Sequence, residues 1–304
     1  MNYLHYDVFT SEPLVGNQLA VFPDARGVTT AQMQAIAREI NFSETTFVLP
    51  REKPDTDVRM RIFTPFVEMP MAGHPTVGST FALAHVGVIP GATKRFVFGL
   101  NVGPTPVDLV WEGGRLRFVW MRQARPNFGP VVEDRAAVAG AIGLDQRDLA
   151  DDLPIQEVSC GVQYLMVPLR DRAAVDRASA NAVSLLNLPM LSRAHPAVFL
   201  FAYEGPTAYS RMFAPGLGVV EDPATGSASG PLGCYLVRYG CVSGPRAQQI
   251  VSIQGVKMGR ASRIHVAISG DAEASTDVKV GGEAVLVARG EFLAASPNGA
   301  ATAR

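Results

Sequence analysis

Residues 72–80 read AGHPTVGST, and residues 220–229 read VEDPATGSAS. Each stretch follows a shorter motif that also recurs, RIFTP at 61–65 and RMFAP at 211–215. Between the two longer stretches Pro75 aligns with Pro223, and a glycine and the serine after it align as well. The aligned residues are 148 positions apart (223 minus 75). Two linked motifs that recur in the same order predict a duplicated, two-domain protein. Chance similarity between loops rich in glycine and proline is the alternative explanation.

Each copy of the repeat predicts a strand, a loop and a helix. Residues 58–62 alternate apolar side chains with arginine, which is the two-residue period of a strand. His74 precedes Pro75, and Asp222 precedes Pro223. Because proline is favoured at the first position of a helix, we expect His74 and Asp222 to occupy the two N-cap positions.

The second predicted helix has an unusual composition for a helix. It contains Gly226, Gly230 and Gly233, each of which costs about 1 kcal/mol relative to alanine in a helix interior. Pro231 should kink the same segment. Such a segment remains helical only if tertiary packing overrides propensity, so we expect a central helix enclosed by sheet.

The rest of the chain predicts an α+β protein with many short strands and one surface helix over residues 29–40. Thr29 and Gln32 form a plausible capping box for that helix. We expect two similar domains, each a mixed sheet or barrel wrapped around a central helix. The expected boundaries are 1–125 and 126–293, with a linker at 122–130 and a mobile tail at 294–304.

The composition of the chain limits its partners. Hydrophobic residues make up 47% of the 304 residues, charged residues 18%, and the net charge is −1, so neither nucleic acid nor an anionic membrane is expected. The first ten residues lack the features of a signal peptide, and no apolar run is long enough to span a membrane. A cytoplasmic protein fits these features best.

Motifs for metals and cofactors are also absent from the sequence. The three cysteines form no CxxC pair and no cluster with histidine, which argues against a zinc site or a disulfide framework. The chain has no HExxH, no GxxxxGK[ST] and no GxGxxG after a strand. We therefore expect no metal and no cofactor.

The two predicted helix starts are candidate anion sites. A helix N-terminus presents free backbone N–H groups and the positive end of the helix dipole. Two facing starts would form a cleft for a substrate carboxylate, with His74 and Asp222 at its rim. Asp222 as a simple N-cap, worth about 1 kcal/mol, and His74 as a capping or core histidine are the alternatives.

A third candidate, Glu44, lies in NFSETTFVLP at 41–50 and begins a strand of apolar and hydroxyl side chains. An exposed glutamate at a strand end is the structural alternative. The serines of GSASG at 226–230 do not form a nucleophile elbow, because Ala228 occupies the position that the motif reserves for serine.

Together these residues resemble the phenazine-biosynthesis isomerase (PhzF-like) family, which has the diaminopimelate epimerase fold. The resemblance covers nearly the whole chain. It rests on FTSEPLVGNQLAVF at 9–22, NFSETTFV at 41–48, RIFTPFVEMPMAGHPTVGS at 61–79, CGVQYLMVPL at 160–169, EDPATGSASGPLGCYL at 221–236 and QGVKMGRASRIHV at 254–266.

The resemblance implies an active site between the two domains, a homodimer and no cofactor. Glu44 matches the family's general acid/base, which moves a proton between carbons of trans-2,3-dihydro-3-hydroxyanthranilate before the enol becomes a ketone. Asp222 matches the aspartate that holds the substrate's amino group, and His74 and Ser227 match the accompanying polar residues. Gly73 and Gly226 match two positions of the family whose backbone N–H groups bind the substrate's carboxylate.

The resemblance also restricts the chemistry. Epimerases of this fold use a cysteine in each domain, and this chain has no cysteine at the corresponding helix starts. A glutamate that moves a carbon-bound proton needs a raised pKa, which burial in a dry cleft supplies. A small carboxylate is the expected substrate, but its identity stays open. The alternatives are a non-catalytic protein that binds small molecules in the same cleft and a hydrolase acting through Ser227.

Overall fold

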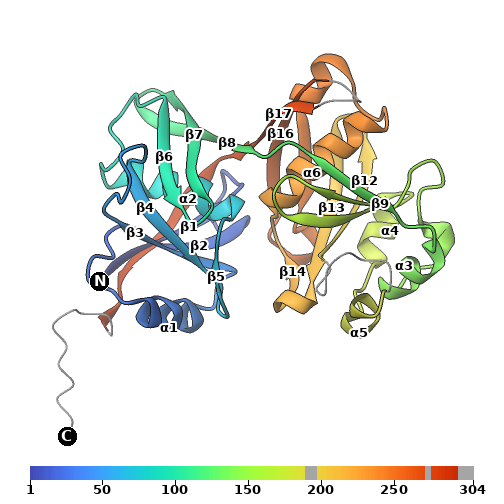
Figure 1. Cartoon of the computed structure of the whole chain (residues 1–304), viewed down its shortest axis with the longest axis horizontal. Coiled ribbons are helices and arrows are strands. Elements are labelled where there is room, and N and C mark those ends of the chain that lie inside the picture. The colour runs from blue at the N-terminus through green and yellow to red at the C-terminus, as the bar shows by residue number, and fades with distance from the viewer. Residues whose placement is uncertain (189–196, 271–274, 294–304) are drawn as a thin grey trace, which may run out of the picture. The chain divides into compact units, whose positions relative to one another are not determined.

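The computed structural model describes residues 1–188, 197–270 and 275–293. The predicted mobile tail, 294–304, lies outside these residues. The chain divides into two compact units (Figure 1). Among the described residues, unit 1 consists of Met1–Met121 and 281–293, and unit 2 lies within Arg122–Val280.

The described residues of unit 1 form two helices and a series of short strands. In chain order the elements are β1 (Asn2–Val8), β2 (Asn17–Phe22), α1 (Thr30–Ile40), β3 (Glu44–Leu49), β4 (Val58–Phe63), β5 (Glu68–Met69), α2 (Gly73–His85), β6 (Arg95–Leu100), β7 (Gly103–Glu112), β8 (Arg115–Gln123) and, after unit 2, β18 (Ala284–Glu291). Strand β8 continues across the boundary between the units.

Unit 2 has the same kinds of element and more short helices. Its elements are β9 (Asn127–Val131), α3 (Arg135–Ala141), β10 (Gln156–Ser159), β11 (Gln163–Pro168), α4 (Arg172–Arg177), α5 (Ala182–Leu186), β12 (Val198–Glu204), β13 (Thr207–Ala214), β14 (Val219–Asp222), α6 (Gly226–Arg238), β15 (Ile250–Gln254), β16 (Ser262–Gly270) and β17 (Ser275–Gly282). In the described part of unit 2, 3-10 turns cover 146–148, 215–217, 244–248 and 256–258.

The two units share one strand topology, as the sequence repeat predicts. In unit 1 the pairings are β1–β2 antiparallel, β2–β3 parallel, β3–β4 antiparallel, β4–β6 parallel and β6–β7 antiparallel. Unit 2 repeats this series with β10, β11, β12, β13, β15 and β16. The duplication therefore extends well beyond the two short motifs that indicate it in the sequence.

The C-terminal strand corrects the predicted domain 126–293. Strand β18 pairs antiparallel with β1, so the residues from Gly281 belong to unit 1. The matching strand in unit 2 is β9, which follows β8 of unit 1 and pairs antiparallel with β10. Because β9 begins at Asn127, inside 122–130, that segment is also not the simple linker that its prolines and polar residues predict.

The helix boundaries correct the alignment of the two copies. Helices α2 and α6 each have 13 residues and begin at Gly73 and Gly226, which are 153 residues apart (226 minus 73). The hydroxyl groups of Thr76 and Ser229, also 153 apart, each donate a hydrogen bond to the carbonyl of their helix's N-cap residue, at 2.8 and 3.0 Å. His74 is therefore matched by Ser227 and not by Asp222.

The predicted N-cap roles of His74 and Asp222 are wrong for the same reason. His74 is the second residue of α2, whose N-cap is Ala72. Asp222 is the last residue of β14, and Thr225 is the N-cap of α6. The carboxylate of Asp222 accepts a hydrogen bond from the Thr225 hydroxyl, so the residues between them form a loop before the helix begins.

Both α2 and α6 are central helices, as the composition of α6 and the family resemblance predict. Helix α2 contacts β1, β2, β3 and β18, and α6 contacts β10, β11 and β16. A Cβ atom at Gly78 would lie 2.6 Å from side-chain carbons of Leu19 and Val8, and one at Gly233 would lie 2.6 Å from Val266. The small residues therefore admit the neighbouring strands to the helix surface.

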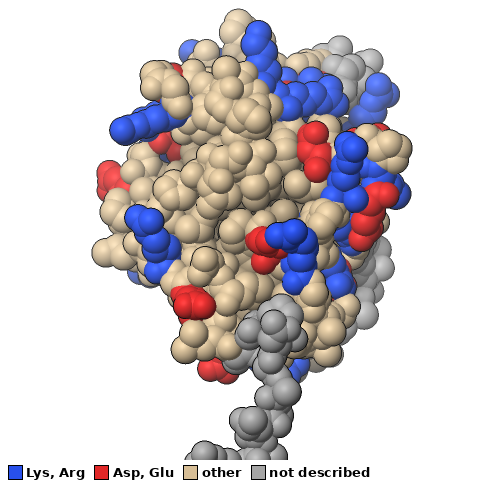
Figure 2. Space-filling view, turned by 90° about the vertical axis from the view of Figure 1, so that its left-hand side faces the viewer, with Lys and Arg blue, Asp and Glu red and all other residues tan. Residues whose placement is uncertain are grey.

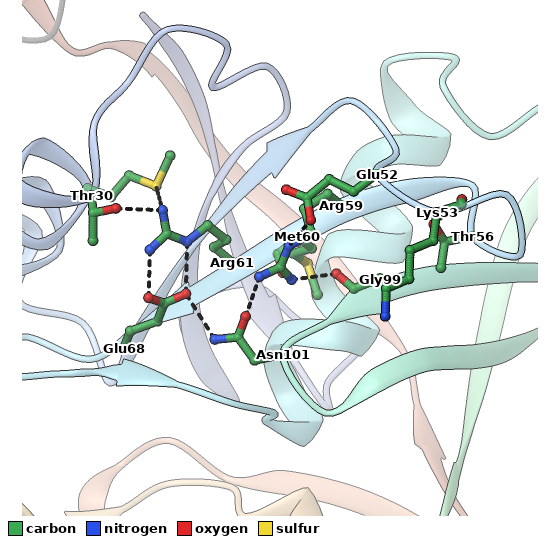
Figure 3. Close-up of polar contacts among 11 residues, drawn as sticks. Thr30, Glu52, Lys53, Thr56, Arg59, Met60, Arg61, Glu68, Gly99 and Asn101 are labelled. Atoms are coloured by element: carbon green, nitrogen blue, oxygen red, sulfur yellow. Dashed lines mark hydrogen bonds and ion pairs between the residues drawn. The ribbon is translucent and has the colours of Figure 1, made fainter.

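A bidentate ion pair fixes the short strand that leads into α2. The guanidinium of Arg61 on β4 donates to both carboxylate oxygens of Glu68 on β5, at 2.8 and 2.6 Å (Figure 3). Asn101, the residue after β6, donates to Glu68 at 3.1 Å and accepts from Arg59, which extends the network to the end of that strand. Because bidentate pairs restrict geometry as well as adding energy, this network orients the approach to the helix.

Unit 2 repeats the pair at the approach to α6. Arg211 on β13 donates to both carboxylate oxygens of Glu221 on β14, at 2.8 Å each. Arg211 is 8% exposed and also donates to the carbonyls of Val175 and Ala178. A buried guanidinium is tolerated because its donors are used in this way.

The surface of unit 1 carries charges of both signs. On the face drawn in Figure 2, lysine and arginine side chains alternate with acidic side chains around a largely uncharged centre. This mixture agrees with the net charge of −1 for the whole chain.

Substitution of a central-helix glycine tests the packing. We expect Gly233→Ala to lower the free energy of unfolding by about 1–3 kcal/mol, because the new methyl group overpacks against Val266. Gly140→Ala in α3 is the control. A Cβ at Gly140 meets nothing within 4 Å, so this change should raise the free energy of unfolding by about 0.5–1 kcal/mol. Urea denaturation of both variants measures the difference, and equal stabilisation would contradict an enclosed α6.

Candidate active site

The unit 1 cluster consists of Asn17, Ser43, Glu44 and His74. Glu44 is the first residue of β3, and His74 lies in the first turn of α2. The carboxylate Oε2 of Glu44 lies 3.4 Å from Nδ1 of His74, and the two side chains are 17% and 4% exposed. The structure therefore brings together two of the residues that the sequence predicts.

Asn17, the first residue of β2, holds the imidazole of His74. Its amide nitrogen Nδ2 lies 3.3 Å from His74 Nδ1, and its oxygen Oδ1 accepts a hydrogen bond from the Ser43 hydroxyl at 3.0 Å. The Asn17 amide and the Glu44 carboxylate therefore both face the same imidazole nitrogen, Nδ1.

Burial keeps His74 neutral. Removal from water lowers the pKa of His74 from 6.5 to about 3, and a smaller effect of a backbone hydrogen bond with Gln18 acts in the opposite direction. At neutral pH the contact between His74 and Glu44 is therefore a contact between a carboxyl group and an uncharged ring. His74 does not serve as a cationic partner for Glu44.

The unit 2 cluster consists of Tyr164, Asp222, Thr225, Ser227 and Gln254. Thr225 donates its hydroxyl proton to Asp222 Oδ2 at 2.5 Å. The fully buried Gln254, at the end of β15, accepts from the Thr225 backbone N–H at 3.0 Å and donates to the Asp222 backbone carbonyl at 2.7 Å. Gln254 thus closes the loop before α6 and fixes the position of Asp222, which is 8% exposed.

Ser227 lies in the first turn of α6. The hydroxyl of Tyr164, on β11, lies 2.6 Å from its Oγ. Gln123 donates to the carbonyl of Gly226 at 2.9 Å, which holds the first residue of the helix.

The starts of α2 and α6 differ from those of the other α-helices in the described ranges. Helices α1, α3, α4 and α5 are each capped by a side chain, and these are Thr29, Asp134, Asp171 and Asn181. The first of these forms the predicted capping box with Gln32. Neither α2 nor α6 has a side-chain cap, although Gly73 and Gly226 at their starts are buried. Buried helix starts with no side-chain cap retain N–H donors for another acceptor.

Sequence reasoning missed the residues that position the two clusters, namely Asn17, Tyr164, Thr225 and Gln254. Two of them are amide side chains beside a glycine, in GN at 16–17 and QG at 254–255, and both are fully buried. An uncharged amide next to an otherwise apolar strand is a usable signal, because a buried amide requires specific partners. Both residues lie within the motifs that carry the family resemblance.

The cysteines do not lie at the helix starts. Cys160 follows β10, and Cys234 lies in the middle of α6, with 3.9 Å between the two sulfur atoms. The hydrogen bond with Cys234 and burial together raise the pKa of the Cys160 thiol. Within the described ranges, no group of three His, Cys, Asp or Glu side chains could hold a metal ion, and no helix could span a membrane.

Comparison with known proteins agrees with the fold and the motifs. The family of phenazine biosynthesis-like proteins matches residues 6–290. A trans-2,3-dihydro-3-hydroxyanthranilate isomerase of Pseudomonas aeruginosa is 38% identical over 291 residues, covering 95% of this chain and 98% of that protein. The crystal structure of a PhzF-family phenazine biosynthesis protein of Bacillus anthracis has a TM-score of 0.85 at 30% identity, covering 96% and 99% of the two chains.

A more distant structure shows the fold alone. A probable proline racemase of Agrobacterium radiobacter has a TM-score of 0.64 at 12% identity, covering 96% of this chain and 92% of that chain. These matches define the class of protein: the chain is an isomerase with the α+β, diaminopimelate epimerase-like fold that the sequence predicts. It belongs to the family of phenazine biosynthesis-like, or PhzF-like, proteins.

The lowered pKa of His74 predicts a loss of stability in acid. Because the folded-state pKa is below the unfolded value, the contribution of neutral His74 is complete above pH 6.5 and is lost as the pH falls toward 3. The loss amounts to about 1.4 kcal/mol per pH unit at most. In His74→Gln the free energy of unfolding should fall less steeply over this interval.

Urea denaturation at a series of pH values measures the slopes. His85→Gln is the control for the loss of a histidine, since His85 is exposed at the other end of α2. A His74→Gln slope equal to the wild-type slope would contradict a neutral, buried His74.

Proposed function

We propose that this isomerase needs no cofactor and moves a proton between two carbons of a small carboxylate, with Glu44 as the general acid/base. The proposed substrate resembles trans-2,3-dihydro-3-hydroxyanthranilate, the compound in the name of the Pseudomonas aeruginosa relative. The two clusters act on one substrate molecule in this proposal, one from each unit. A homodimer in the cytoplasm is part of the same proposal and rests on the family relationship alone.

The observation that carries this proposal is the pair of buried helix starts that have no side-chain cap. A carboxylate accepts hydrogen bonds from the backbone N–H groups of such a start and interacts favourably with the helix dipole. Gly73 and Gly226 are the first residues of the two helices, and their lack of side chains allows a ligand to approach the backbone closely. The carboxylate would be bound there without a cationic side chain.

The duplication supports a single acid/base group. Thr45 of β3 pairs with Phe63 of β4, and Val198 of β12 pairs with Phe213 of β13. The two phenylalanines occupy the same place in the repeated motif RIFTP and RMFAP. The residues before Thr45 and Val198 are therefore also matched, and these are Glu44 and Ala197. Unit 2 has a methyl group where unit 1 has a carboxylate, so one group both removes and returns the proton in our proposal.

Asp222, the proposed binding group, likewise has a counterpart of different chemistry in the other unit. Asp222 is the last residue of β14 and pairs with Met212, and Met69 is the last residue of β5 and pairs with Ile62. Asp222 and Met69 are therefore equivalent positions of the two units. Unit 1 thus has a thioether where unit 2 has a carboxylate. We assign to Asp222 the substrate's ammonium group, since a charge-assisted hydrogen bond is about twice as strong as a neutral one.

The proposed reaction proceeds in three steps. The Glu44 carboxylate removes a proton from carbon, and the electron pair of the broken C–H bond delocalises toward the substrate carboxylate, where the helix N–H groups stabilise the developing charge. The protonated Glu44 then returns the proton to a different carbon of the conjugated system. The resulting enol tautomerises to a ketone. His74, neutral and held by Asn17, keeps the Glu44 side chain in position without neutralising it.

Replacement of Glu44 by glutamine tests the assignment. Glutamine keeps the size of the side chain but cannot accept the proton, so kcat should fall by about 10²–10⁴-fold. The affinity for cyclohexanecarboxylate, a non-reacting ring carboxylate, should remain within a few-fold of the wild type in calorimetric titration. Glu39→Gln, at an exposed position on α1, is the control and should retain full turnover. Wild-type turnover in Glu44→Gln would disprove the role.

Replacement of Asp222 by asparagine separates its structural role from its binding role. The amide oxygen of asparagine can still accept the hydrogen bond of Thr225, so the melting temperature should not change. The affinity for 2-aminocyclohexanecarboxylate should fall about tenfold or more, because the charge that pairs with the ammonium group is lost. The affinity for cyclohexanecarboxylate, which lacks the amino group, should stay the same. Equal effects on the two ligands would contradict ammonium recognition by Asp222.

A further inference from the structure

The two units hold the second residue of their central helix in the same way. In unit 1, Asn17 of β2 contacts the ring of His74 on α2 at 3.3 Å. In unit 2, Tyr164 of β11 contacts the hydroxyl of Ser227 on α6 at 2.6 Å. Strands β2 and β11 occupy the same place in the topology, and His74 and Ser227 are 153 residues apart, which is the offset of the helix starts. The register of these strands matches Tyr164 to Leu19 and not to Asn17, so the two units reach the same helix position with side chains from different points of corresponding strands.

We propose that Tyr164 is a positioning residue that turns the hydroxyl proton of Ser227 toward the ligand's carboxylate. This inference rests on the proposed function, which places a carboxylate at the start of α6. A phenol is the stronger acid of the two hydroxyl groups, so Tyr164 donates and Ser227 accepts. Ser227 then has its own proton left to donate, and the start of α6 offers a hydroxyl donor beside its backbone N–H groups.

The neighbouring serine shows what Ser227 would do without this contact. Ser229, two residues further along α6, donates its hydroxyl proton to the backbone carbonyl of Thr225, four residues earlier. Serine hydroxyls in helices commonly form this bond with their own backbone. The same rotation at Ser227 would direct its proton to the carbonyl of Pro223 and away from a ligand. Tyr164 opposes that rotation because its ring is 5% exposed in the core strand β11 and its hydroxyl has a fixed position.

A double-mutant cycle tests the proposal, with 2-aminocyclohexanecarboxylate as the titrated ligand. We expect Tyr164→Phe to weaken binding by about 5–10-fold, the range of one neutral hydrogen bond. Ser227→Ala should weaken binding at least as much. If Tyr164 acts through Ser227, the double variant should bind no more weakly than Ser227→Ala alone.

Tyr239→Phe is the matched control. It removes a tyrosine hydroxyl that donates to Gln156 at 2.5 Å in the same unit, so it should lower the melting temperature about as much as Tyr164→Phe. Its affinity for the ligand should equal that of the wild type. A purely structural role of Tyr164 predicts the same result for both tyrosine variants, which would overturn the inference.

Two further outcomes are decisive. Additive losses in the double variant would mean that Tyr164 acts independently of Ser227, and this would overturn the inference while leaving the proposed function intact. Failure of the wild type to bind 2-aminocyclohexanecarboxylate at all would overturn the carboxylate site and the role of Tyr164 together.

Discussion

The burial of the first turns of α2 and α6 is the constraint on which the rest of each unit depends. A helix that begins inside a protein cannot rely on bulk water for its first N–H groups, and neither helix has a side-chain cap. The glycines of both helices admit strands to their surfaces, and the Arg61–Glu68 and Arg211–Glu221 pairs orient the chain that enters them. Each unit thus presents backbone donors at a defined place, and the polar side chains of its cluster surround them.

The two copies have diverged at the positions to which the proposed function assigns the chemistry, while the scaffold has been retained. Unit 1 keeps Glu44 and His74, and unit 2 has Ala197 and Ser227 at the matching positions. Unit 2 keeps Asp222, where unit 1 has Met69. This asymmetry separates proton transfer from recognition of the ammonium group in the proposed mechanism. A racemase that works with two opposed groups would need matching functional side chains in both copies, and no such match exists at these positions.

Sequence reasoning recovered the features that local pattern determines. The glycines of 226–233 predicted an enclosed helix, Thr29 and Gln32 predicted a capped one, and the motif around Glu44 predicted a residue that the structure places beside His74. It failed where distant contacts decide. Asp222 before a proline has the appearance of an N-cap, but Gln254, more than thirty residues later, holds the loop that delays the helix. Similarly, nothing local in 284–291 shows that this strand pairs with β1. The roles of the site residues remain predictions.

Each unit contains the last strand of the other copy, since β9 follows unit 1 in the chain but pairs in unit 2, and β18 follows unit 2 but pairs in unit 1. The duplicated stretch of sequence is therefore not the same as the compact unit. Strand β1 is synthesised before unit 2 and strand β18 after it, so the sheet of unit 1 is completed only once unit 2 has been synthesised. A single ancestral copy would have had the same difficulty, because the strand after its β8 equivalent leaves its own sheet. Two such copies could have completed each other by exchanging that strand. Fusion of a strand-swapped dimer into one chain would then explain why the exchange is reciprocal in the present protein.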